Sequence, residues 1–164
     1  MLGSEAESSG DMVFLDAGMF IGALLKGDRR HAEARQWVES ARTGKLTACT
    51  TASVLSEVYG ALTWEKAIPR HEPAEAARAV RLLVEPPSAI VILPENRDVI
   101  LRLLQLTARY SLRARRVHDA RHAATALSAG IRSVYTYDVN DWKVFAAEGL
   151  QIVGPPTVKA QLAE

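Results

Sequence analysis

Four acidic residues, with a fifth close behind, stand where isolated carboxylates are not expected: Asp16, Glu57, Asp119, Asp138 and Asp141. Asp16 and Asp138 each end an apolar, strand-like run, and Asp141 follows Asp138 by three residues. Glu57 lies within an apolar helical pattern, and Asp119 opens an alanine-rich helical segment. Carboxylate oxygens are the ligands that hard divalent cations prefer, so the set predicts a site for Mg²⁺ or Mn²⁺.

Converging carboxylates repel one another and raise some of their own pKa values unless a cation lies between them. A bound divalent ion would position a water or hydroxide, polarise a phosphodiester and stabilise charge on the leaving oxygen. Two ions about 4 Å apart would clamp both oxygens, and a single ion fits the sequence equally well.

Each aspartate also has an ordinary explanation. Asp16 can cap a helix that starts at Ala17, and Asp119 can complement the dipole of its helix. Asp138 and Asp141 can be turn and cap residues before the last helix. The metal-site interpretation therefore depends on the acids being brought together.

Glu57 is the hardest of the acids to explain locally. Val54, Val58 and Ala61 share its helical face at i, i+3, i+4 and i+7 spacing. A carboxylate facing a core costs several kcal/mol unless a cation, an arginine or water pairs with it. The alternative is that Glu57 lies at the edge of the stripe and extends to solvent.

Arginines crowd around Asp119 in the sequence: Arg109, Arg113, Arg115, Arg116 and Arg121. The planar fork of donors on arginine suits phosphate, so Arg113, Arg115, Arg116 and Arg121 are candidate RNA contacts. The alternative is a solvated basic loop and helix face. The net charge of +1 excludes a molecule that is basic overall.

Length and composition favour one soluble domain. The 164 residues suffice for a core without staples, and the single Cys49 excludes an internal disulfide and a multi-cysteine zinc site. No segment offers the roughly 20 apolar residues that span a bilayer. Residues 1–11 lack the apolar stretch of a signal peptide and are expected to be a disordered lead-in or an extended start upstream of Met12. We expect a cytoplasmic protein.

Short apolar runs alternate with longer helical patterns along the chain. The predicted strands are Met12–Asp16, Leu46–Thr50, Ile90–Leu93, Val134–Asp138 and Leu150–Val153. The predicted helices are Ala17–Leu25, Arg30–Thr43, Thr51 or Ser53 to Lys66, Pro73–Val84, Glu95–Tyr110, His118–Ala129 and Asp141–Glu148. This order predicts a mainly parallel sheet with helices on both faces, and ligands bind such sheets at the carboxyl ends of strands.

Four segments in this order resemble the motifs of PIN-domain nucleases, and most closely those of the VapC toxins of VapBC toxin–antitoxin pairs. They are Val13–Asp16, Thr51–Val58, His118–Ala126 and Thr136–Trp142. The resemblance implies an α/β fold, a three-layer α/β/α sandwich with a mainly parallel sheet of about five strands. It covers residues 12–156, which leaves 157–164 as a C-terminal tail.

The resemblance also implies a Mg²⁺- or Mn²⁺-dependent endoribonuclease that forms a homodimer and is inhibited by a VapB-like antitoxin. By position, Asp16 and Asp119 match the principal metal ligands and Glu57 the acid that orients the metal or water. Asp138 matches the fourth acidic position, Asp141 an auxiliary one. Thr136 matches a small hydroxyl residue near the site.

The chain departs from the family pattern after the first aspartate, where a Thr or Ser is usual. Ala17 and Gly18 stand there instead, so a hydroxyl that could support the metal is missing or its role passes to Thr136. The departure keeps open an inactive PIN domain that binds RNA or protein. A non-toxin PIN nuclease of RNA processing would share the same residues.

Two further patterns have weaker interpretations. His118 and His122, with Asp119 between them, resemble the H-E-x-x-H zinc-peptidase signature, but the acid is shorter and no third ligand is evident. Trp37 and Trp64 are expected in the core, because aromatic residues at helical spacing usually pack there. A groove for a partner helix is the alternative for both.

Overall fold

Five short strands form one sheet in the order β3-β2-β1-β4-β5, and every neighbouring pair is parallel. The computed structural model describes residues 12–164, so the predicted lead-in 1–11 lies outside the described residues. The strands are β1 (Val13–Leu15), β2 (Ala48–Thr51), β3 (Val91–Leu93), β4 (Ser133–Tyr135) and β5 (Gln151–Gly154). The fully parallel sheet confirms the α/β prediction.

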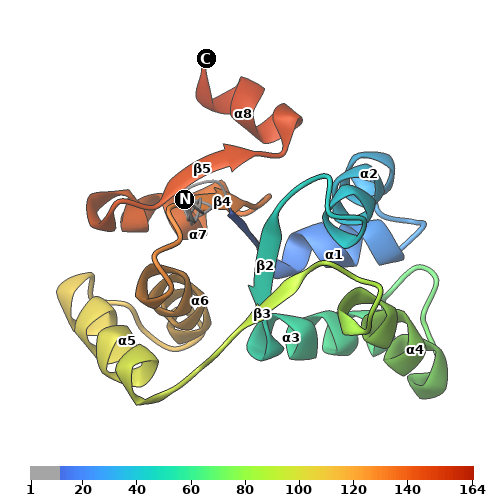
Figure 1. Ribbon diagram of the computed structural model, residues 1–164, viewed down its shortest axis with the longest axis horizontal. Coiled ribbons are helices and arrows are strands. Elements are labelled where there is room, and N and C mark those ends of the chain that lie inside the picture. Colours follow the sequence, from blue (N-terminus) through green and yellow to red (C-terminus); the bar gives the residue numbers. More distant parts are fainter. Residues whose placement is uncertain (1–11) are drawn as a thin grey trace, which may run out of the picture.

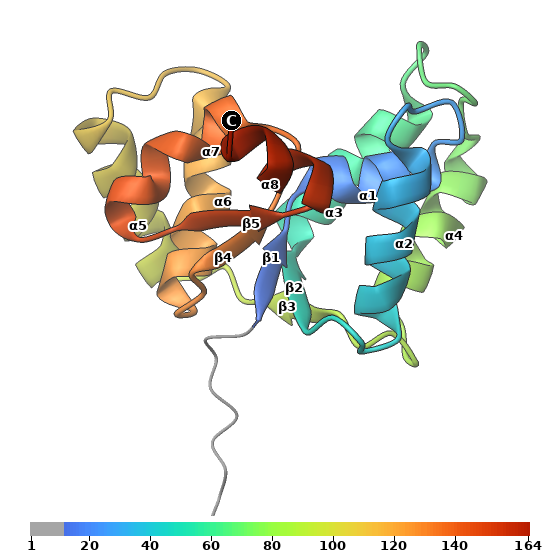
Figure 2. The same ribbon diagram turned by 90° about the horizontal axis from the view of Figure 1, so that it is seen from above.

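Two groups of helices cover the two faces of the sheet (Figures 1 and 2). One group holds α1 (Ala17–Leu24), α2 (His31–Arg42), α3 (Ala52–Thr63) and α4 (Pro73–Val84). The other holds α5 (Arg97–Arg109), α6 (Arg116–Ser128) and α7 (Val139–Trp142), followed by the 3-10 helix η2 (Lys143–Glu148). This arrangement is the predicted three-layer sandwich.

The chain changes direction across the sheet beside β1. From β1 it runs outward to β2 and β3, and α5 and α6 then carry it back to β4 on the other side of β1. The carboxyl ends of β1 and β4 therefore flank the point at which the strand order reverses. Crevices at such points are where open parallel sheets bind ligands.

Local signals explain most helix ends. Pro73 opens α4, as the sequence predicts, and Glu72 and Glu75 form a capping box there. Thr51 caps α3 by accepting a hydrogen bond from the backbone N–H of Val54. Gly149 ends η2 with a φ of +93°, a conformation that favours glycine.

The structure corrects several predicted boundaries. β4 ends at Tyr135, so Asp138 lies beyond the strand instead of ending it. α6 starts at Arg116 instead of His118, which puts Arg116 in the helix and Asp119 in its first turn. The segment predicted as one helix from Asp141 to Glu148 divides into α7 and η2. Past the predicted domain end, Pro156–Leu162 forms helix α8.

Aromatic side chains fill the core between the sheet and α6, α7 and η2. Phe14, Trp142 and Phe145 are buried and pack ring to ring. Trp37 packs edge-on against Tyr135, at 5.6 Å between ring centroids, whereas Trp64 is 56% exposed. The core prediction is therefore wrong for Trp64, which lies at the C-cap of α3. None of the helices within residues 12–164 is long and apolar enough to cross a membrane.

Candidate functional site

Asp16 is held rigidly where β1 meets α1. It is 6% exposed, and its Oδ1 accepts a hydrogen bond from the backbone N–H of Ala17 at 2.8 Å. Its Oδ2 accepts from the Thr136 hydroxyl at 2.8 Å and from the indole N–H of Trp142 at 3.0 Å. Asp16 thus caps a helix, as the ordinary explanation holds, and also faces the end of β4.

The hydroxyl of Thr136 connects two of the predicted acids. Thr136 is fully buried just past β4, where it donates to Asp16 and accepts from the backbone N–H of Asp138 at 2.9 Å. Asp138 is the N-cap residue of α7, but its side chain makes no capping hydrogen bond. The capping role proposed for Asp138 therefore does not occupy its carboxylate.

Asp119 reaches the same neighbourhood from the first turn of α6. Its Oδ2 lies 3.2 Å from Nε of Arg116, which also donates through Nη2 to the backbone carbonyl of Asp141 at 3.3 Å. Burial raises the pKa of Asp119 to about 6, with further contributions from the charges of Asp141 and Asp16 against the lowering effect of Arg116. The structure thus brings Asp119, Asp141 and Asp16 close enough to repel one another.

The carboxyl of Asp138 belongs to the same group of charges. Desolvation raises its pKa, and the charges of Asp16, Asp141 and Glu57 raise it further, while Arg30 lowers it. Five acids from four separate segments therefore share one electrostatic neighbourhood at the β1–β4 reversal: Asp16, Glu57, Asp119, Asp138 and Asp141. We call this set the acidic cluster.

Glu57 lies at the edge of α3 and not on its core face, so the core-facing prediction is wrong and the alternative holds. Its side chain is 41% exposed, and Oε1 lies 2.8 Å from Nε2 of His122. Burial works to raise the pKa of Glu57, but the hydrogen bond from His122 and the positive charges nearby, that of Arg121 among them, together outweigh burial, and the pKa lies below its ordinary value. Val54 and Val58 fill the core instead.

The donor set of the acidic cluster suits a hard cation, since every ligand atom it offers is a carboxylate oxygen. Mutual repulsion among these acids is the electrostatic condition that a cation relieves. In the side-chain arrangement described for residues 12–164, however, no three Asp, Glu, His or Cys side chains are grouped tightly enough to form a metal site. Both oxygens of Asp16 accept hydrogen bonds, and Asp119 is paired with Arg116.

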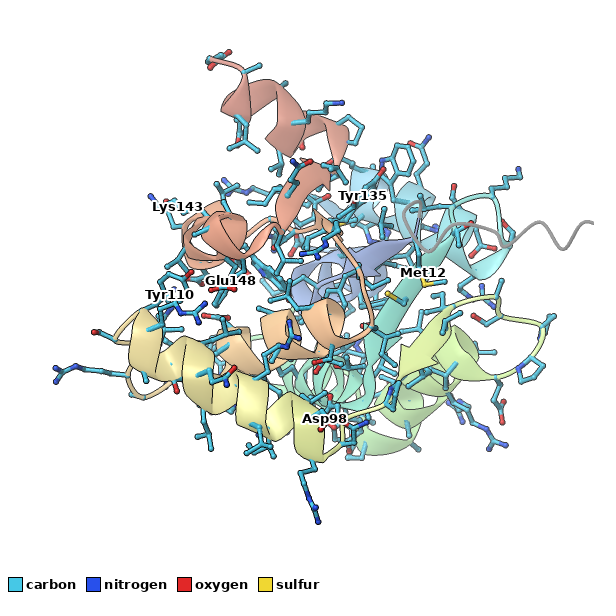
Figure 3. The ribbon with its side chains drawn as sticks, turned by 60° about the vertical axis from the view of Figure 1, so that its left-hand side comes forward. Met12, Asp98, Tyr110, Tyr135, Lys143 and Glu148 are labelled. Carbon is cyan, nitrogen blue, oxygen red and sulfur yellow. The ribbon has the colours of Figure 1, made fainter. Side chains whose placement is uncertain are left out.

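The four candidate RNA-binding arginines divide into two pairs. Arg113 and Arg115 are exposed on the loop before α6. Arg116 and Arg121 are partly buried, Arg116 against Asp119 and Arg121 through a 3.3 Å hydrogen bond from Nη1 to the Ser53 hydroxyl. The loop begins after Tyr110, the C-cap residue of α5, whose hydroxyl donates a hydrogen bond to Glu148 at 2.7 Å (Figure 3).

Sequence reasoning missed three residues that shape the site. Trp142 donates to Asp16, and His122, considered only as a zinc ligand, contacts Glu57. Arg30 is fixed by two hydrogen bonds from its guanidinium to Asp28 and stacks over the ring of Tyr137 at 4.6 Å. In the sequence, Trp142 and His122 are equally consistent with core residues. Nothing in the sequence near Arg30 indicates where its side chain lies.

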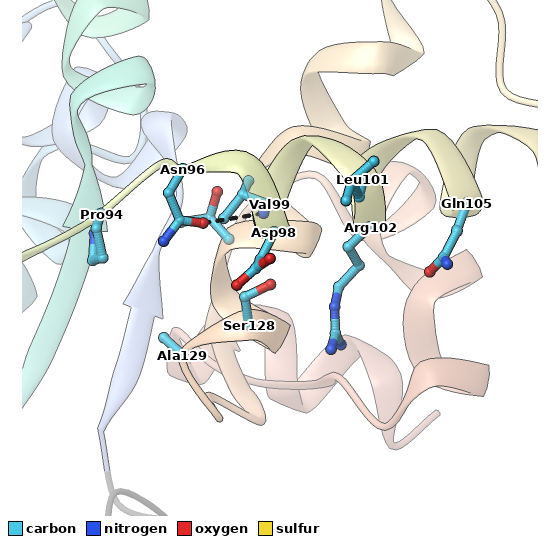
Figure 4. Close-up of a pocket in the computed structure, with 10 residues that line it drawn as sticks. Pro94, Asn96, Asp98, Val99, Leu101, Arg102, Gln105, Ser128 and Ala129 are labelled. Atoms are coloured by element: carbon cyan, nitrogen blue, oxygen red, sulfur yellow. Dashed lines mark hydrogen bonds between the residues drawn. The ribbon is translucent and has the colours of Figure 1, made fainter.

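The zinc-peptidase alternative gains no support from the placement of the two histidines. His118 is exposed, whereas His122 is 2% exposed and contacts Glu57. A hollow of about 390 Å³ lies at the other end of α6 from Asp119, against α5 (Figure 4). Its lining includes Asp98, Arg102 and Ser128 and none of the predicted site residues, so it is separate from the acidic cluster.

The sequence matches the family described as PIN domain over residues 13–147. The chain belongs to the PIN-domain family. The β1–β4 reversal and the acidic cluster lie within the matched residues, and the predicted resemblance is confirmed. A search of curated proteins returned no match.

Solved structures of toxins and toxin–antitoxin complexes share the PIN fold of this chain. The Mycobacterium tuberculosis toxin VapC20, described as cleaving the sarcin–ricin loop, is 22% identical with a TM-score of 0.63, over 87% of this chain and 99% of that one. VapBC-1 from nontypeable Haemophilus influenzae is 15% identical with a TM-score of 0.57, over 86% and 97% of the two chains. FitAcB from Neisseria gonorrhoeae is 16% identical with a TM-score of 0.56, over 86% and 96%.

Proposed function

We propose that this PIN domain is a metal-dependent endoribonuclease that hydrolyses RNA phosphodiester bonds, and that it is the toxin of a VapBC-type pair. The observation that carries the proposal is the convergence of Asp16, Asp119 and Asp138 at the strand-order reversal, where burial and the charge of Asp16 raise the pKa of both Asp119 and Asp138. The likeness to VapC20, described as cleaving the sarcin–ricin loop, supports the choice of RNA, and the likeness to VapBC-1 supports an antitoxin partner. A cytoplasmic location and a homodimer belong to the same proposal.

Asp16, Asp119 and Asp138 would hold Mg²⁺ or Mn²⁺, with Glu57 orienting the ion or its water and Asp141 in an auxiliary place. The ion, when bound, supplies polarisation of the phosphodiester and an activated water. Asp16 is held in place for this role by Thr136 and Trp142. Asp119 would hold the ion in place of its present contact with Arg116, and the Arg116 guanidinium beside the cluster would then be free to bind the RNA phosphate.

The contact between Thr136 and Asp16 favours an active enzyme over an inactive binding module. The residue after Asp16 is Ala17, which offers no hydroxyl, but the Thr136 hydroxyl already bonds the Asp16 carboxylate at 2.8 Å. The Thr136 hydroxyl can therefore replace the hydroxyl that the family pattern has at residue 17. A PIN nuclease of RNA processing uses the same groups and differs only in its partner.

Incubation of the purified protein with a structured RNA, with Mn²⁺ and with EDTA, tests the proposal. We expect cleavage only with the metal and a loss of at least 100-fold in Asp16→Asn, which keeps the size of the side chain and removes its charge. Arg78→Ala, on exposed α4, is the matched control and should cleave like the wild type. Cleavage by Asp16→Asn at the wild-type rate would contradict the proposed site.

Expression in a bacterial host separates a toxin from a processing enzyme. A toxin should arrest growth when induced, Asp16→Asn should not, and co-expression of the cognate antitoxin should restore growth. Normal growth under induction of an RNA-cleaving wild type would favour the processing nuclease.

A further inference from the structure

His122 is a buried polar residue placed directly behind the acidic cluster. It lies one helical turn after Asp119 on α6, is 2% exposed, and its Nε2 lies 2.8 Å from Oε1 of Glu57 on α3. Its ring packs against Phe14, with centroids 6.3 Å apart. The imidazole is thus fixed by the core, while the Glu57 side chain that it contacts is 41% exposed.

The hydrogen-bond inventory of the ring sets the direction of this contact. An ionised carboxylate only accepts, so the proton of the contact must reside on Nε2 of His122. Nδ1 is buried and has no hydrogen-bond partner within residues 12–164. A proton on Nδ1 would be a buried donor without an acceptor, which favours Nε2 as the ring nitrogen that carries the proton.

α6 and α3 come from opposite faces of the sheet, and two side-chain hydrogen bonds join them across the site: His122 to Glu57 and Arg121 to Ser53. α6 therefore carries Asp119 itself and, one turn on, the donor that reaches Glu57. A carboxylate at the edge of α3 with 41% of its surface exposed could otherwise turn into solvent.

We propose that His122 is a positioning residue, whose Nε2–H holds the Glu57 carboxylate toward the acidic cluster. The role rests on the proposed function in one respect, namely that Glu57 serves the same site as Asp119. It requires a donor at the Nε2 position and does not require a histidine as such. Such supporting hydrogen bonds typically change metal affinity 10- to 100-fold when they are removed.

Two amide substitutions at His122 test whether the hydrogen-bond donor at Nε2 or only the packing of the ring affects the metal site. In His122→Gln the amide nitrogen reaches the place of Nε2, and in His122→Asn it stops near the place of Nδ1. We expect the Mn²⁺ affinity of His122→Gln to stay within about 3-fold of the wild type and that of His122→Asn to fall about 10-fold. Equal losses in the two variants, at matched melting temperatures, would overturn the proposal.

A double-mutant cycle shows whether His122 acts through Glu57. Glu57→Ala removes the acceptor at an exposed position, and in that background His122→Asn should leave the Mn²⁺ affinity unchanged. An undiminished effect of His122→Asn in the Glu57→Ala protein would show that Glu57 is not the target. Nitrogen-15 spectra of the metal-free wild type should show a proton on Nε2 and none on Nδ1, and the reverse tautomer would refute the contact.

The same proteins distinguish this inference from the proposed function. A wild type that binds Mn²⁺ with the expected coupling but cleaves no RNA would refute the nuclease and leave the role of His122 standing. If the wild type cleaves RNA and His122→Asn has the same Mn²⁺ affinity and cleavage rate, the role of His122 is refuted and the nuclease stands. A wild type that binds no Mn²⁺ would refute both.

Discussion

At the scale of single residues, the hydroxyl of Thr136 joins the ends of β1 and β4. It donates to Asp16 at 2.8 Å and accepts from the backbone N–H of Asp138 at 2.9 Å, with no exposure to solvent. A single hydroxyl group thus connects Asp16 and Asp138 by hydrogen bonds.

Thr136→Val keeps the shape of the side chain and removes both hydrogen bonds. Because Asp16 then loses a donor and the Asp138 N–H an acceptor in a buried place, the free energy of unfolding should fall by about 1–3 kcal/mol. Thr136→Ser keeps the hydroxyl and should lose about 1 kcal/mol for one methyl group. Urea titration measures both, and a valine variant as stable as the serine one would argue against the hydrogen bonds.

Asp119 should make the metal-free protein less stable as the pH rises. Its folded pKa of about 6 lies above the ordinary 3.8, so the folded state binds the proton more tightly than the unfolded state. The contribution of Asp119 to stability is therefore largest below pH 4 and is lost as the pH rises toward 6 and above.

Asp119→Asn removes this penalty. At pH 7 without metal the variant should be more stable than the wild type by about 1–2 kcal/mol, after allowance for partial exposure of the side chain. The stability difference should shrink as the pH falls from 7 to 4. Chemical denaturation in EDTA across this range measures the difference, and a difference that does not vary with pH would contradict the burial of Asp119 beside other acids.

At the scale of elements, the loop before α6 and the first turn of α6 divide the arginines by role. Ala114, between Arg113 and Arg115, adopts a positive φ of 50°, and both flanking side chains are exposed. Arg116 instead contacts the acidic cluster, through the side chain of Asp119 and the backbone carbonyl of Asp141. The loop pair, and not Arg116, is therefore the part of the basic segment available to phosphates at a distance from the cluster.

Replacing Arg113 and Arg115 together by Ala should weaken RNA binding and flatten its salt dependence. Two lost contacts to single-stranded phosphate lower the slope of log K against log[salt] by about 1.4. Arg70→Ala with Arg78→Ala removes the same charge from exposed positions beside and on α4, and should leave the slope as it is. The slopes are obtained by measuring RNA binding from 50 to 300 mM salt, with each pair of arginine substitutions made in the Asp16→Asn protein so that the RNA is not cleaved. Equal slopes for the two double variants would assign Arg113 and Arg115 to solvation.

At the scale of the whole molecule, the acidic cluster couples folding to metal. The repelling carboxylates come together only in the folded state, so a cation that binds there stabilises that state alone. At a concentration 100 times its Kd, the gain is about 2.7 kcal/mol. For a domain of this size, that gain corresponds to a rise in melting temperature of about 5–10 °C.

Thermal unfolding with increasing Mn²⁺ tests this coupling without any substrate. The wild type should show the rise, and Asp16→Asn should show little of it. A control in which Na⁺ replaces Mn²⁺ at equal ionic strength accounts for general screening. A melting temperature unmoved by millimolar Mn²⁺ in the wild type would count against the cluster as a metal site.

The sequence by itself determined most of the elements and their order, α8 excepted, because the signals for these are local. The limits of Pro73–Val84 were predicted to the residue, since Pro73 and the Pro86-Pro87 pair beyond it act on their own backbone. The apolar runs predicted the parallel sheet. The motifs predicted the PIN family, which the family match over residues 13–147 confirms.

The tertiary structure alone decided how the site is held together, because its contacts join residues far apart in the chain. Asp16 meets Thr136 across 120 positions and Trp142 across 126, and Glu57 meets His122 across 65. Periodicity put Glu57 on a core stripe, whereas packing left it at the edge of α3 within reach of a buried histidine. A pattern along one helix cannot show which side chain another helix will present to it.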